Sequence, residues 1–104
     1  MLRKGAEIEA KSNGGVTPLN VAAQNGYTEI VKYLVQNGAD IEAKDNQGMT
    51  PILWAAFKGH FSIAKYLLGE GSNFNSKAFT DQNALDLAEE KGHTRIVDLI
   101  KSHM

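Results

Sequence analysis

The stretch GGVTPLNVAAQNGYTEIVKYLVQNGADIEAK, residues 14–44, recurs in altered form as QGMTPILWAAFKGHFSIAKYLLGEGSNFNSK at residues 47–77. The two copies are 33 positions apart, as the step from Thr17 to Thr50 shows. A third copy, NALDLAEEKGHTRIVDLI at residues 83–100, keeps the same register. A fixed period of this length indicates a solenoid, because each unit buries its apolar face only by stacking on the next unit.

Each unit begins with a signal for the start of a helix. Thr17 and Thr50 suit the N-cap position, and each is followed by a proline, which costs nothing at the first helical position. In the third unit Asn83 takes the cap position, and Asp86 is placed to complete a capping box. We therefore predict that a helix starts at each of these three points.

The rest of each unit predicts a tight turn, a second helix and a polar loop. Gly26 and Gly59 are placed to end the first helices, since glycine accepts the left-handed conformation there. Ile30, Val31 and Leu34 have the spacing of one buried stripe on the second helix. The polar, turn-rich stretches that follow the second helices are expected to form hairpin-like fingers projecting from the stack.

With its Thr-Pro pairs, Ala-Ala pairs and glycines recurring in phase, the chain resembles the ankyrin repeat family. The resemblance implies an all-α repeat solenoid of stacked helix–turn–helix units with β-hairpin-like finger loops. The predicted division is a single ankyrin repeat domain over residues 1–104, with a partial repeat at 1–11, repeats at 12–44 and 45–77, and a C-terminal capping repeat at 78–104.

The chain departs from the family at a position where relatives often carry histidine, two residues after the proline. Here the three units carry Asn20, Leu53 and Asp86. Asn20 and Asp86 are expected to keep a polar link, whereas Leu53 is expected to present an apolar spot in the second repeat.

The two ends of the array differ. Glu89, Glu90, Asp98 and Lys101 give the third unit the wettable outer face that a terminal repeat needs. At the other end the sequence starts in mid-repeat, because GAEIEAK at residues 5–11 matches the end of the next unit. We expect either a piece of a longer array or a first face that another chain covers.

Composition narrows the class of partner and the compartment. The chain has a formal net charge of −1 and no cysteine. The charge offers no general attraction to nucleic acid or to an anionic membrane, and the sequence shows neither a signal peptide nor a membrane span. The absence of cysteine favours a reducing compartment, so we expect an intracellular, cytoplasmic protein.

The sequence carries no pattern that predicts catalysis, a metal site or a cofactor. His60 and His93 occupy equivalent positions after helix-ending glycines, which favours a structural role in the turn between helices. The glycines stand alone at helix ends and form no phosphate-binding loop. We therefore expect no enzyme activity and no cofactor.

The aromatic and apolar residues that the repeat does not require point to a binding surface. In the ankyrin family the equivalent positions line the concave face formed by fingers and inner helices, and large exposed apolar residues favour interfaces. Trp54, beside an Ala-Ala pair, is expected to pack in the core instead. The predicted anchors are Met49, Leu53, Phe57 and Phe79. The predicted polar surround is Asn13, Val16, Gln24, Asn25, Asn46, Gln47, Lys58, Gln82 and Lys91.

These features predict a non-catalytic module that binds a partner protein through its concave face. Local packing between fingers is the alternative role for the anchors. Two further functions stay open: a regulatory segment of a larger enzyme or channel, and a structural unit that self-associates through its uncapped N-terminal repeat.

Overall fold

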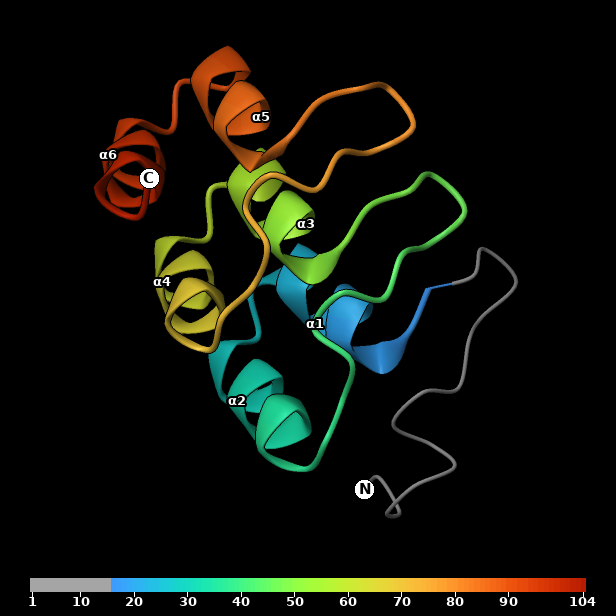
Figure 1. Cartoon of the computed structure of the whole chain (residues 1–104). Helices are drawn as coiled ribbons and strands as arrows, with labels where there is room; N and C mark the ends of the chain where they lie inside the picture. The colour runs from blue at the N-terminus through green and yellow to red at the C-terminus, as the bar shows by residue number, and fades with distance from the viewer. Residues whose placement is uncertain (1–15) are drawn as a thin grey trace.

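The computed structural model describes residues 16–104, which form three antiparallel helix pairs and no strand. The helices are α1 (Pro18–Asn25), α2 (Thr28–Gln36), α3 (Pro51–Lys58), α4 (Phe61–Gly69), α5 (Ala84–Glu90) and α6 (Thr94–Ser102). Figure 1 shows α1, α3 and α5 as an inner row, flanked on one side by the outer helices and on the other by the loops. The predicted partial repeat at residues 1–11 and the predicted contact residue Asn13 lie outside the described residues.

The helix starts follow the predicted capping residues. The Thr17 hydroxyl accepts a hydrogen bond from the backbone N–H of Asn20 at 3.2 Å. Thr50 plays the same part at the start of α3. Asn83 and Asp86 form the predicted capping box, in which each side chain accepts from the other's backbone N–H at 2.9 and 3.1 Å. Each cap pairs a backbone donor that the helix itself leaves free.

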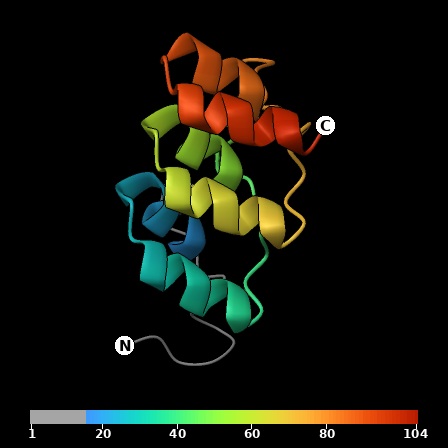
Figure 2. The ribbon, with the colours of Figure 1, turned by 90° about the vertical axis from the view of Figure 1, so that its left-hand side faces the viewer.

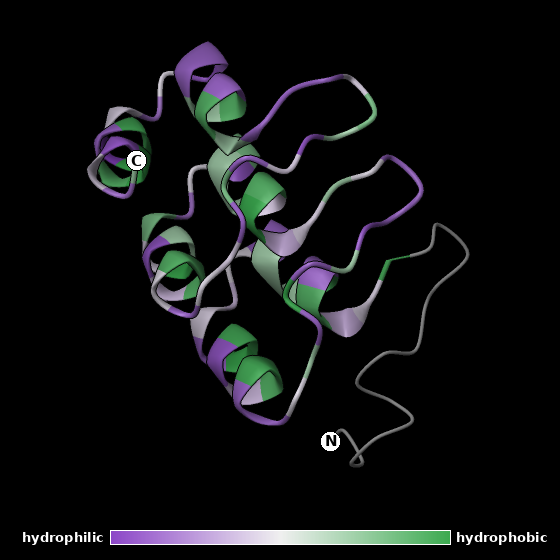
Figure 3. Cartoon of the chain, viewed as in Figure 1, coloured by the Kyte–Doolittle hydropathy of each residue, from purple (hydrophilic) through white to green (hydrophobic). Residues whose placement is uncertain are grey.

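The core lies between the two rows of helices, where their apolar faces meet (Figure 3). α3 packs against α1, α4 and α5, and the three outer helices stack one above another (Figure 2). Val31 and Leu34 are fully buried, as the predicted stripe requires. Ile30 is 47% exposed, so its predicted burial is wrong. Among the described helices, the main contacts of α2 are with α1 and α4.

The fingers are loops with hairpin-like hydrogen bonds near their tips. We call residues 37–50, between α2 and α3, finger A, and residues 70–83, between α4 and α5, finger B. Asp45 N donates to Met49 O at 3.0 Å in finger A, and Ala78 N donates to Gln82 O at 2.9 Å in finger B. The two fingers lie side by side in Figure 1 and are joined directly, since Phe79 N donates to Gln47 O at 3.0 Å.

Candidate functional site

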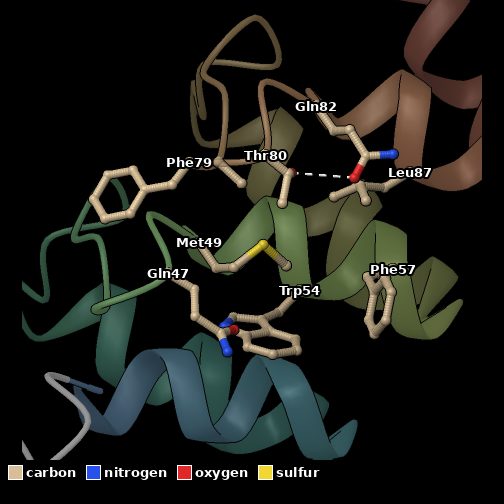
Figure 4. A pocket seen from close by; sticks show the side chains of 9 residues that line it. Gln47, Met49, Trp54, Phe57, Phe79, Thr80, Gln82 and Leu87 are labelled. Carbon is tan, nitrogen blue, oxygen red and sulfur yellow. Dashed lines mark hydrogen bonds between the residues drawn. The ribbon is translucent and has the colours of Figure 1, made fainter.

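A groove of about 360 Å³ lies between finger B, the tip of finger A and α3 (Figure 4). Five predicted site residues line it: Gln47, Met49, Phe57, Phe79 and Gln82. Four other lining residues were not among the predicted ones: Trp54, Ala78, Thr80 and Leu87. The volume falls at the small end of the range for ligand pockets, and it suits a single large side chain better than an extended ligand.

The floor of the groove is the indole of Trp54, which is only 9% exposed. Its Nε1 donates to Asp45 Oδ2 at 3.0 Å. The other carboxylate oxygen of Asp45 accepts from the backbone N–H groups of Gln47 and Met49, both at 2.9 Å. One buried carboxylate therefore fixes the tip of finger A to α3 and holds the indole in place, which fits the predicted core packing of Trp54.

Phe57 lines one end of the groove, and two lysines that do not line it contact the Phe57 ring. The Phe57 ring meets Trp54 edge-on, with 5.9 Å between ring centroids. Lys91 Nζ lies 4.8 Å and Lys58 Nζ 5.6 Å from the centroid of the same ring. Such cation–π contacts are worth about 0.5–1 kcal/mol at exposed sites. Within residues 16–104 neither lysine is ion-paired, the single described pair being Lys77 with Asp81.

Phe79 stands at the other end of the groove and is 73% exposed. Its backbone is bonded to Gln47, and its ring lies against Gly48, where an added Cβ would come within 2.6 Å of Phe79 Cδ1. Gly48 also has a φ of +76°, a conformation that side chains disfavour. The backbone hydrogen bond and the contact with Gly48 therefore hold the exposed Phe79 ring in place.

The wall next to finger B is polar and uncharged. Thr80 Oγ1 donates to Gln82 Oε1 at 3.1 Å, and Gln82 Nε2 donates to Glu90. Thr80 and Gln82 already have hydrogen-bond partners within the domain. The groove therefore offers an apolar surface whose polar edge is already hydrogen-bonded. Its lining residues include no carboxylate, imidazole or thiol, which are the groups that most often act as acid, base or nucleophile.

Two of the predicted anchors are not exposed. Leu53 is fully buried, so its predicted place on the binding surface is wrong. The reason is that α3 is the central inner helix and packs between α1 and α5. Met49 is also buried, although it lies in the floor of the groove. Exposure is the property that was predicted incorrectly for both residues.

The remaining predicted residues lie beside the groove or away from it. Asn46, Gln24 and Asn25 do not line it, and Val16 is half-buried at the start of the described chain. Asn20 keeps the expected polar link, because its amide donates to the backbone carbonyls of Ala43 and Met49 at 3.2 and 3.3 Å.

Metal sites and membrane-spanning helices have no candidate in the described part of the chain. Residues 16–104 contain no group of three or more His, Cys, Asp or Glu placed to hold a metal ion. No helix in the same range has the length and apolar character to cross a membrane.

A family model described as ankyrin repeats (3 copies) matches residues 1–78 and 45–104. The chain belongs to the ankyrin repeat family. Ankyrin repeats are in general protein–protein interaction modules and are typically non-catalytic. Comparison with curated proteins finds no significant match. The ankyrin fold accounts for both the stacked helix pairs and the position of the groove between fingers and inner helices.

Proposed function

We propose that this ankyrin domain is a non-catalytic recognition module that binds a partner protein in the groove between fingers A and B and α3. The observation that carries the proposal is Phe79, a large aromatic ring held 73% exposed at the edge of an apolar groove. Exposed aromatic residues beside a shaped pocket are the usual anchors of protein interfaces.

The groove is already formed in the unbound domain. Trp54 is fixed by Asp45, Phe57 packs on Trp54, and the Phe79 backbone is bonded to finger A. A surface of this kind loses little conformational entropy on binding, which favours affinity from a small contact area.

The test is affinity capture from a cell extract with three versions of the domain: the parent, Phe79→Ser and Tyr27→Ser. Tyr27 is also exposed but does not line the groove, so it is the matched control. We expect the same proteins to be retained by the parent and Tyr27→Ser and lost with Phe79→Ser. If all three versions retained the same proteins, the groove would not be the binding site.

Self-association is a second candidate, and one specific observation favours it. Four large apolar side chains of the first helix pair and its turn are between 40 and 53% exposed: Val21, Tyr27, Ile30 and Tyr33. Sedimentation velocity over a wide concentration range tests it, with Ile30→Lys as the variant. Concentration-dependent dimers that disappear in Ile30→Lys would establish this function, and a monomer at all concentrations would exclude it.

A further inference from the structure

We infer that the groove selects an extended acidic segment in which one large apolar side chain enters the groove while neighbouring carboxylates meet Lys58 and Lys91. The inference rests on the proposed function and specifies the chemistry of the partner. Its two parts, an apolar pocket and a pair of cations at one end of that pocket, come from separate observations.

The floor of the groove favours an apolar side chain over a polar one. Met49 and Leu87 are buried and line the groove together with the Trp54 indole, whose only polar atom is already bonded to Asp45. A hydroxyl or amide pushed into this space would find no partner on the floor and would lose its bonds to water. A large apolar side chain loses nothing there and removes apolar surface from water.

The two lysines at the Phe57 end of the groove favour a negatively charged partner. Lys58 and Lys91 belong to neighbouring repeats, yet both ammonium groups converge on the single ring of Phe57. Neither is ion-paired within the described chain, and the carboxylate of the adjacent Glu90 is bonded to Gln82. Both positive charges attract an incoming carboxylate, and binding one does not require either lysine to leave the Phe57 ring.

The observations favour a protein segment over a nucleic acid. The domain carries a formal net charge of −1, and the pair of lysines at Phe57 is a local feature at one end of a groove. Nucleic-acid binding draws on many phosphate contacts along an extended basic surface. Two cations beside a pocket that holds a single side chain match a short acidic motif with an apolar anchor.

The test is selection of random 12-residue peptides displayed on phage against three intact domains. These are the parent, a charge-reversed groove variant (Lys58→Glu with Lys91→Glu), and a charge-reversed control (Lys65→Glu with Lys101→Glu). The control lysines are exposed on the outer helices α4 and α6, away from the groove. Melts by circular dichroism establish that all three domains are folded.

We expect the parent and the control to enrich peptides with a large apolar residue flanked by Asp or Glu, and the groove variant to enrich Lys or Arg instead. A synthetic peptide from the parent selection should change the fluorescence of Trp54, the only tryptophan of the chain. Its dissociation constant should rise about five- to tenfold in Lys58→Ala with Lys91→Ala, as expected for losing two exposed ion pairs.

Two other outcomes separate this inference from the proposed function. Enriched peptides without an excess of acidic residues, whose binding is still lost in Phe79→Ser, would overturn the inference and leave the groove as the binding site. Enriched peptides that bind the Phe57→Ala and Phe79→Ser variants with the same affinity as the parent would overturn both the inference and the proposed function.

Discussion

His93 Nε2 lies 3.2 Å from the backbone carbonyl oxygen of Phe57, 36 residues earlier in the chain. A carbonyl oxygen only accepts, so the imidazole donates through Nε2. His60 makes the same bond, at 3.1 Å, to the carbonyl of Gln24. Each histidine therefore links the turn of its own helix pair to the end of the preceding inner helix. These bonds give both histidines the structural role that the sequence predicts. The bond from His93 is made to Phe57, which lines the groove.

The ring of His93 also explains why Gly59 is a glycine, and this gives the first prediction. Gly59 has a φ of +81°, and an added Cβ would lie 2.6 Å from His93 Cε1. Gly92 has a φ of +75° but nothing within 4 Å of an added Cβ. Both Gly59→Val and Gly92→Val therefore meet backbone strain, of order 1–3 kcal/mol. Only Gly59→Val must also displace the imidazole.

We expect Gly59→Val to lose at least about 1 kcal/mol more free energy of unfolding than Gly92→Val, which corresponds to about 4–8 °C in melting temperature for a domain of this size. Thermal melts of the parent and both variants measure the difference. Equal losses would show that the imidazole contact adds nothing, and a Gly59→Val melt within about 2 °C of the parent would contradict the strained turn itself.

The second prediction concerns the carboxylate that holds the groove floor. Asp45→Ala removes the acceptor for Trp54 Nε1 and for the backbone N–H groups of Gln47 and Met49. Leaving these buried donors unpaired should cost about 2–4 kcal/mol of unfolding free energy. Tryptophan emission should shift to longer wavelength as the indole gains water.

Asp98→Ala is the matched control for this prediction, because Asp98 is an exposed carboxylate on the outer helix α6, away from the groove. Surface substitutions of this kind change stability little, so the control should stay within about 0.5 kcal/mol of the parent. Urea denaturation followed by Trp54 fluorescence measures both variants. An Asp45→Ala domain as stable as Asp98→Ala would show that the Asp45 carboxylate does not hold the groove floor.

The third prediction is that folding needs no divalent metal. His60 and His93 each use Nε2 on a backbone carbonyl, which leaves those nitrogens unavailable as ligands. We expect the circular-dichroism melt to be unchanged in excess EDTA, because a structural metal contributes directly to folding free energy. A clear fall in melting temperature with EDTA, reversed by adding zinc, would assign a metal-binding role to the histidines.

The helix pairs were predictable from the sequence because capping is a local property. The hydroxyl of Thr17 or the side chain of Asn83 reaches a donor only three residues away, so the pattern along the chain contains the whole interaction. Burial of a side chain depends on the neighbouring repeats, so the spacing of residues within one repeat does not predict it. Ile30 and Ile63 are equivalent in the repeat, yet Ile63 is fully buried because α4 packs between α2 and α6, while Ile30 is exposed.

The groove was predictable only in part for the same reason. Phe57 and Phe79 are residues that the repeat does not require, and the structure places both along one groove. Lys58 and Lys91, predicted only as part of the polar surround, contact the Phe57 ring. Trp54 precedes Phe57 by three residues on α3, and that spacing places both on one helix face, so the sequence does contain a signal for Trp54 in the groove. The bond from Trp54 to Asp45 joins a helix to a finger, and no periodicity along the chain predicts such a contact.

The last prediction concerns the distribution of stability along the stack. A repeat array gains much of its stability from interfaces between units. α3 and α4 pack against helix pairs on both sides, whereas α1 and α2 pack against one pair among the described elements and leave Val21, Ile30 and Tyr33 exposed. Native-state hydrogen exchange should therefore show amides at residues 17–34 opening with a lower free energy than amides at residues 50–67. The measurement needs a sample proven monomeric by sedimentation, because a second chain on the exposed face would protect the first pair. Equal or greater protection of residues 17–34 in a monomer would show that stability does not follow the number of interfaces.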